Sequence, residues 1–330
     1  MNIKALPYKA PIKVSENSIF LYDTAQKYYI WNRSTLEEIC SHDFSGEFVN
    51  VRNLGDGFVF NLPKKEEGFI YEEGSKKLSK IITDYSLYAK LEGGKYIGTH
   101  KKEVKYHLLD SKFESIQSFD RIDDVYYTLI CNQGFVDYSR NKGETHLLRL
   151  RNPLTNEITY NYELPNRGSS HEYSDPYFLL SVEGKSEWSI YCFDLEKKEL
   201  IGTLNFKGLP RYIIDENSKT VVICSNFRYF EVKLDTFEIV NEFVLERERE
   251  AMRPEVMRYL TKDGIFFYCN GKEQKLGKIN RQTGVAEWEH NYIPENNERL
   301  NIYFWEKVLE EEYLIHILDN NSPRLVLMKE

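Results

Sequence analysis

Short apolar runs alternate with polar turn signals along the whole chain. Residues 57–60, 177–181 and 220–224 are such runs, and β-branched and aromatic side chains dominate them. Runs of this length and composition, bounded by Gly, Asn or Asp, are typical of β-strands rather than helices. The pattern therefore predicts an all-β chain built from many short strands.

A recurring hairpin gives the pattern its period. Residues 276–290 read as a strand, a turn from Asn280 to Gly284, and a second strand. An Asn side chain bonds the backbone that follows it, and Gly accepts positive φ, so both residues favour a tight turn. Degenerate copies place the polar turn residue at Asn32, near Glu73, and at Asp110, Asn152, Asp194, Asp235 and Asn280, at intervals of 37 to 45 residues. That spacing is typical of the four-stranded blades of a β-propeller.

Each turn follows a continuous apolar run. We expect these runs to be the inner strands of the blades, because neighbouring blades would cover both of their faces. Residues 300–328 supply only three strands, and residues 2–8 can supply the fourth, which would close the ring and remove a free edge. Seven internal turns and this composite blade predict one domain, residues 1–330, with eight four-stranded blades. Seven blades is the alternative if the turn near Glu73 is misassigned.

One blade carries a more specific motif. Residues 278–288, Lys-Ile-Asn-Arg-Gln-Thr-Gly-Val-Ala-Glu-Trp, resemble the repeat of quinoprotein-like propellers, which reads apolar-Asp-x-x-Thr-Gly-x-x-x-Trp. The other blades keep the apolar, Asx, turn and strand skeleton, and look like divergent WD40-like or lactonase-like repeats. No blade has the Gly-His and closing Trp-Asp of a WD40 repeat. The resemblance implies a toroid with a central channel, and it implies no single activity.

The net charge and the cysteines indicate which partners and which cellular compartment to expect. The net charge is -8, so nucleic acid is a poor partner, and no apolar stretch approaches the ~20 residues that span a bilayer. The N-terminal residues lack the apolar core of a secretory signal. The five cysteines are scattered and never form C-x-x-C. These features predict a protein of the cytoplasm with reduced thiols.

Chemical motifs are scarce. None of the seven histidines pairs with another at i,i+2 or i,i+4, and there is no G-x-S-x-G elbow, P-loop or dinucleotide fingerprint. The paired carboxylates Asp123-Asp124 and Glu37-Glu38 suit charged hairpins. The sequence therefore predicts no catalytic residue, no metal and no cofactor.

Two functions from different classes fit these features. The first is a non-catalytic propeller that binds another protein, with the acidic balance favouring a basic partner; an immunity-type protein that neutralises a toxin is one form of it. The alternative is an enzyme of the hydrolase, lyase or lactonase type with its site in the central channel. Converging His, Asp and Glu in the channel would favour the enzyme.

The candidate partner-binding residues lie in two segments that we expect to be long inter-blade loops, because function concentrates on loops held by a rigid scaffold. Residues 166–175 contribute Arg167, His171, Glu172 and Tyr173, and residues 246–258 contribute Arg247, Arg249 and Arg253.

Overall fold

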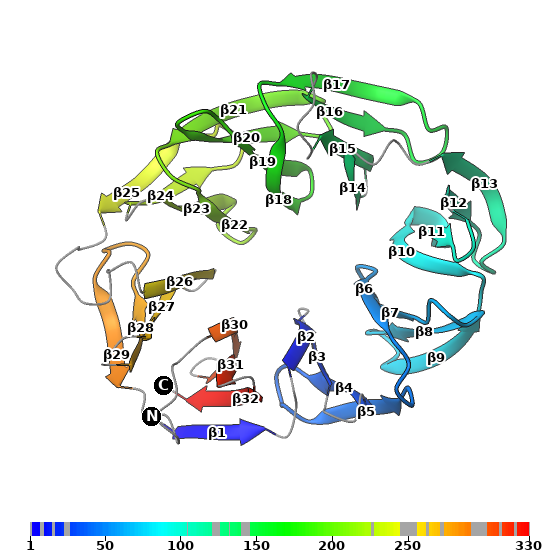
Figure 1. The fold of residues 1–330 in the computed structure, drawn as a ribbon, viewed down its shortest axis with the longest axis horizontal. Helices are drawn as coiled ribbons and strands as arrows, with labels where there is room; N and C mark the ends of the chain where they lie inside the picture. Colours follow the sequence, from blue (N-terminus) through cyan, green and yellow to red (C-terminus); the bar gives the residue numbers. More distant parts are fainter. Residues whose placement is uncertain are drawn as a thin grey trace.

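The computed structural model of the chain is a ring of β-sheets (Figure 1). It describes residues 2–6, 10–14, 17–22, 27–103, 105–120, 126–131, 133–139, 146–225, 228–244, 256–261, 264–270, 274–291, 302–309, 312–319 and 322–329. Apart from one 3-10 turn, η1 (Glu92–Gly94), the regular elements of these residues are strands. None of the described residues belongs to a helix long and apolar enough to cross a membrane.

The described strands pair into eight four-stranded antiparallel sheets, which we number as blades 1 to 8. Blade 1 contains β2 (Ala10–Val14), β3 (Ser18–Tyr22), β4 (Lys27–Asn32) and β5 (Glu38–Asp43). Blade 2 contains β6 (Asn50–Asn53), β7 (Gly57–Asn61), β8 (Glu67–Glu72) and β9 (Lys77–Ile82). Blade 3 contains β10 (Tyr85–Leu91), β11 (Lys95–His100), β12 (Lys105–Leu109) and β13 (Ser115–Asp120). Blade 4 contains β14 (Tyr126–Cys131), β15 (Gly134–Ser139), β16 (His146–Arg151) and β17 (Ile158–Leu164).

The other half of the ring repeats the arrangement. Blade 5 contains β18 (Gly168–Ser174), β19 (Tyr177–Glu183), β20 (Trp188–Asp194) and β21 (Glu199–Phe206). Blade 6 contains β22 (Arg211–Asp215), β23 (Thr220–Ser225), β24 (Arg228–Lys233) and β25 (Ile239–Val244). Blade 7 contains β26 (Val256–Thr261), β27 (Gly264–Asn270), β28 (Gln274–Ile279) and β29 (Ala286–Asn291). Blade 8 contains β30 (Ile302–Leu309), β31 (Glu312–Asp319), β32 (Ser322–Lys329) and β1 (Asn2–Leu6).

Blade 8 combines the two ends of the chain. β1 lies outside β32 and pairs with it antiparallel, in a register that runs from Asn2 opposite Lys329 to Leu6 opposite Leu325. The two chain ends meet beside this sheet (Figure 1). The strand that the sequence analysis placed in residues 2–8 thus occupies residues 2–6, and its backbone groups pair with the last strand of the chain.

The apolar runs predicted to be inner strands are in fact the second strands of their blades. Innermost in the ring are strands such as β18 and β22 (Figure 1), and the runs at 177–181 and 220–224 fall in β19 and β23. All six residues of β23 are buried. A second strand has a paired strand on each side, whereas an innermost strand such as β18 is paired on one side only and keeps polar residues.

The turns between third and fourth strands follow the predicted chemistry. Asn280 Oδ1 accepts hydrogen bonds from the backbone N–H groups of Gln282 (2.8 Å) and Thr283 (3.0 Å), and Gly284 has φ +70°. The hairpin near Glu73, on which the blade count depended, is present between β8 and β9. In blade 6 the prediction of Asp235 was wrong by two residues. The turn there begins at Lys233, whose carbonyl accepts the Phe237 N–H at 3.0 Å.

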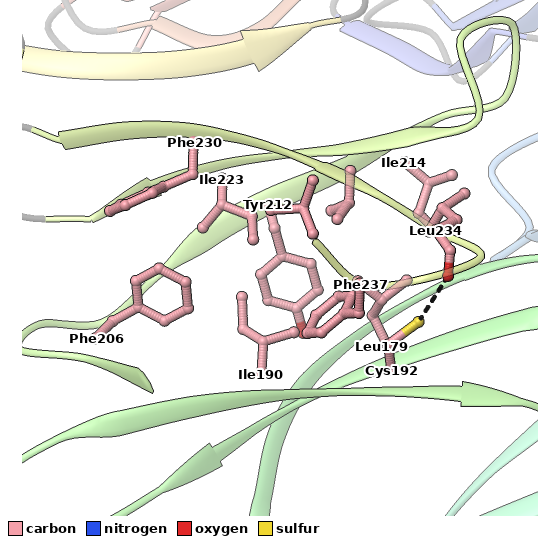
Figure 2. Close-up of a cluster of buried hydrophobic side chains, with 12 residues drawn as sticks. Leu179, Ile190, Cys192, Phe206, Tyr212, Ile214, Ile223, Phe230, Leu234 and Phe237 are labelled. Carbon is pink, nitrogen blue, oxygen red and sulfur yellow. Dashed lines mark hydrogen bonds between the residues drawn. The ribbon is translucent and has the colours of Figure 1, made fainter. Parts of the chain in front are cut away.

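Apolar side chains pack between neighbouring blades and form the core. Figure 2 shows the cluster between blades 5 and 6, in which Leu179 and Ile190 meet Tyr212, Ile223 and other side chains of blade 6. Each large apolar side chain buried in this way stabilises the fold by roughly 1.5–3 kcal/mol. Similar clusters lie between successive blades from blade 1 to blade 6.

One position recurs at these interfaces, and we call it the plug position: the first residue inside the turn between third and fourth strands. In blades 5 and 6 it is Leu195 and Leu234, both buried in the apolar cluster shared with the preceding blade. In blade 7 it is Arg281, which reaches back into blade 6. In blade 2 it is Glu73. In blades 5, 6 and 7 the side chain at this position fills the space between two blades.

Candidate functional site

The segment predicted to be a long loop at residues 166–175 is mostly the strand β18, the innermost strand of blade 5 (Figure 1). The polar sequence Gly-Ser-Ser-His-Glu-Tyr-Ser indicated a loop because it has no apolar run. It forms a strand because β19 pairs with it along most of its length, from Gly168 opposite Val182 to Ser174 opposite Tyr177. His171, Glu172 and Tyr173 therefore lie in β18, and Arg167 directly precedes it, so they do not form a free loop.

His171 faces blade 4. Its Nδ1 lies 2.9 Å from the hydroxyl of Tyr138, and its ring packs against Tyr127 and stacks on Phe178. A histidine held by a tyrosine hydroxyl and three aromatic rings is well placed to fix the spacing of blades 4 and 5. These contacts join two blades and stabilise the fold.

Tyr173 and Arg167 are also engaged by neighbouring side chains. The Tyr173 hydroxyl donates a 2.6 Å hydrogen bond to Gln133 Oε1 of blade 4. Arg167 binds Glu183 through Nε (2.9 Å) and Nη2 (2.5 Å), so its guanidinium is held within the β18–β19 hairpin. Substituting either residue would disturb blade packing or hairpin pairing as well as any partner contact.

Glu172 lies on the opposite face of β18 from His171, because successive side chains of a strand alternate. Burial raises the pKa of this carboxyl to about 7. Burial raises the pKa of the Tyr212 hydroxyl in blade 6 to about 12, and the negative charge of Glu172 also raises this pKa. A carboxyl of this kind exchanges its proton near neutral pH. His171 and Glu172 point to different interfaces and do not form an acid–base pair.

The second predicted group, Arg247, Arg249 and Arg253, lies outside the described residues. Only the end of that segment is described, where residues 256–258 begin β26.

The most buried charges serve the fold. Arg151 Nε lies 2.5 Å from Asp137 Oδ2 inside blade 4, and the Thr128 hydroxyl donates to the same carboxylate at 2.6 Å. The guanidinium also lies over the Phe135 ring. Such a pair satisfies its own donors and acceptors and leaves none for a ligand. No group of three or more His, Cys, Asp or Glu suited to a metal ion occurs among the described residues.

Two buried thiols, Cys131 and Cys192, are poorly suited to nucleophilic chemistry. Burial raises the pKa of Cys131 to about 11 and that of Cys192 to about 12. A thiol that ionises only at such pH is a poor nucleophile at neutral pH. Both side chains belong to the apolar clusters between blades.

The surface feature that the sequence analysis missed is the outer edge of blade 6. On β25, Ile239, Val240 and Val244 are exposed, the last two by 51% and 63%. The outer strands β9, β13 and β17 each expose only one large apolar side chain: Ile82, Ile116 and Ile158, respectively. β25 is the last strand of its sheet, and no described strand pairs with its outer edge.

The sequence contained a signal for this edge. Ile239 and Val240 are adjacent in a segment predicted to be the last strand of a blade. Two adjacent strand residues face opposite sides, so an outer strand cannot easily bury both. The β24–β25 register shifts at this point, between Glu231 and Val232 of β24, and leaves Val240 without a directly opposed partner.

Comparisons with known proteins identify the fold. No protein-family profile matches the chain, and no curated protein sequence matches it. Among solved structures, the WD40 domain of SCAP from fission yeast is 8% identical, with 99% of this chain and 94% of that chain covered and a TM-score of 0.59. The dihydro-heme d1 dehydrogenase NirN, solved in complex with DHE, is 11% identical, with coverage of 97% and 72% and a TM-score of 0.58.

BamB from Moraxella catarrhalis is also similar: it is 8% identical, 99% of this chain and 98% of that chain are covered, and the TM-score is 0.52. Identities this low show the fold alone. They confirm the predicted β-propeller fold. The chain has the β-propeller fold.

Proposed function

We propose that this β-propeller is a non-catalytic scaffold of the cytoplasm that binds another protein along the outer edge of β25. The observation that carries the proposal is the group of exposed apolar side chains, Ile239, Val240 and Val244, on a strand with no described neighbour outside it. An unpaired apolar edge is a liability that proteins usually protect with charges, bulges or a covering segment. An extended segment of a partner would cover it.

Strand addition supplies the recognition chemistry. Backbone groups along the free edge would pair with an extended partner segment, and Val240 and Val244 would provide apolar contacts for its alternate side chains. Glu242 lies between them on the same face and already pairs with Arg228. The net charge of -8 favours a basic partner through electrostatic steering. A propeller that neutralises a basic toxin, as an immunity-type protein does, is one form of this function.

The test compares two variants that change exposure and charge in the same way. Val240→Lys combined with Val244→Lys should abolish capture of a stoichiometric protein from native lysate, measured by affinity purification and quantitative mass spectrometry. Ile82→Lys on β9 combined with Ile116→Lys on β13 is the matched control, because these side chains are 71% and 53% exposed on the outer strands of other blades. Equal recovery of the same protein with both variants would contradict binding at β25.

A second candidate function rests on Glu172. Because burial raises the pKa of this carboxyl to about 7, it has the protonation behaviour of a general acid or base near neutral pH. A hydrolase, lyase or lactonase acting in the channel would use such a group. Turnover of lactone or ester substrates that Glu172→Gln removes would support this candidate, and no turnover by the wild-type protein across such a panel would remove it.

A further inference from the structure

The plug position of blade 2 leaves a pocket where blades 5, 6 and 7 are filled. In blades 5 and 6, Leu195 and Leu234 occupy this position and are buried. In blade 7, Arg281 fills it with hydrogen bonds to Asp215 (2.6 Å) and Glu231 (2.7 Å). In blade 2 the residue is Glu73, and a pocket of about 280 Å³ opens between blades 1 and 2. The fold thus provides a cavity at one of several equivalent sites.

Neutral hydrogen-bonding groups dominate the wall of this pocket. They come from the start of β3, the β4–β5 turn and the end of β8, and are Asn17, Ser18, Asn32, Ser34 and Tyr71. The charged lining groups are Glu73 and Lys76, one of each sign on the same turn. Their charges offset one another, so the pocket favours a neutral, hydrogen-bonding occupant over an ion.

Tyr71 gives the pocket a buried polar anchor. Its side chain is fully buried, and its hydroxyl meets no donor or acceptor with hydrogen-bond geometry. Burial raises the pKa of this phenol, with the Ser18 hydroxyl near enough to oppose the shift. A buried hydroxyl without a full hydrogen bond costs roughly 1–3 kcal/mol, so an occupant that supplies one is stabilised.

We infer that the pocket between blades 1 and 2 binds a small hydroxyl-rich molecule of monosaccharide size. The volume is near the lower limit of ligand pockets, which suits a single sugar ring and excludes larger ligands. Tyr71 and Ser18 would meet hydroxyls at the buried end. The Glu73 carboxylate, which accepts a 3.3 Å hydrogen bond from Asn17 Nδ2, would accept another from the ligand near the mouth. This site lies on different blades from β25 and is independent of the proposed protein-binding edge.

The closing experiment fills the pocket with the residue that other blades use. Glu73→Leu places a leucine at the plug position, as in blades 5 and 6. Glu196→Leu is the matched control, because Glu196 lies exposed in the equivalent turn of blade 5, beside the plug leucine. The probes are D-glucose, D-galactose and myo-inositol, each titrated to 10 mM and followed by saturation-transfer NMR and by the ligand-induced rise in Tm.

At least one probe should bind the wild-type protein and Glu196→Leu saturably, and should not bind Glu73→Leu. Tyr71→Phe, which keeps the ring, should weaken that binding roughly three- to tenfold. A cooperative thermal transition in each variant shows that it is folded. If no probe binds the wild-type protein, or if Glu73→Leu binds as the wild type does, the inference is wrong.

Discussion

Glu172 and His171 are neighbours in the chain, yet they belong to different blade interfaces. His171 is fixed against Tyr138 of blade 4, and Glu172 faces blade 6 on the other side of the strand. Because successive side chains of β18 point to opposite faces, each of the two residues contacts a different neighbouring blade. The histidine is a packing residue, while the carboxyl keeps its proton to an unusually high pH.

Glu172 predicts a specific pH dependence of stability. Burial raises its pKa from 4.5 to about 7, so the folded protein holds this proton more tightly than the unfolded chain does. The contribution of this proton to the free energy of unfolding is fully present below pH 4.5 and is lost as the pH rises through about 7. Glu172→Gln should match the wild type at pH 4 and exceed its free energy of unfolding at pH 8 by on the order of 2 kcal/mol. Urea denaturation at both pH values measures this.

Glu163→Gln is the control for this prediction, because Glu163 is exposed on the outer strand β17. It should leave the difference between the two pH values unchanged. A Glu172→Gln variant with the same pH dependence as the wild type would show that the carboxyl is not desolvated.

At the element scale, the turn between third and fourth strands both closes a hairpin and joins two blades. In blade 7, Arg281 binds Asp215 and Glu231 and also donates to the Tyr229 hydroxyl at 3.2 Å. Although burial of Asp215 acts in the other direction, the hydrogen bonds from Arg281 and Ser218 hold the pKa of its carboxyl below its ordinary value. The loop that ends a hairpin thus also carries an inter-blade ion pair.

Removing that cation should be costly. Arg281→Ala leaves two mostly buried carboxylates without their partner, and we expect a loss of about 3 kcal/mol in the free energy of unfolding. Lys102→Ala is the comparison, because Lys102 pairs with Glu66 and both side chains are exposed, by 73% and 67%. Its loss should barely change the stability, because water screens such pairs. Equal effects of the two substitutions in chemical denaturation would contradict an inter-blade role for Arg281.

The turn that contains Arg281 ends at Gly284, where a residue with a Cβ would be unfavourable. Its φ of +70° is unfavourable for residues with a Cβ, and a Cβ there would lie 2.6 Å from the Phe243 ring of blade 6. We expect Gly284→Ala to destabilise the protein by about 1–2 kcal/mol. Gly74→Ala, in the turn of blade 2 where a Cβ would meet nothing within 4 Å, should change the stability little. Thermal denaturation of the two variants tests the difference.

Local chemistry explains which parts of the fold could be predicted from the sequence. The turn at Asn280 was predictable because its side chain and Gly284 act within five residues. The strand β18 was not, because nothing in its polar sequence indicates a strand and its pairing with β19 stabilises it. The plug position could not be predicted either, because Leu195, Arg281 and Glu73 differ in chemistry and their burial depends on the neighbouring blade.

At the scale of the whole molecule, the described strands form eight sheets arranged in one ring, and the chain ends share a sheet. Without β1, the outer edge of β32 would have unpaired backbone groups next to the β31–β32 pairing. Five residues at the start of the chain thus carry the pairing that completes blade 8. The central claim is that this pairing completes the ring in solution.

Hydrogen–deuterium exchange of the β32 backbone, in the full chain and in a variant lacking residues 1–6, tests that claim most directly. In the full chain, the amides of β32 that face β1 should exchange as slowly as those that face β31. In the truncated chain the β1-facing amides should exchange at least about tenfold faster, while those of β19 and β23 keep their protection. Equal exchange of β32 in the two proteins would contradict closure of the ring by β1.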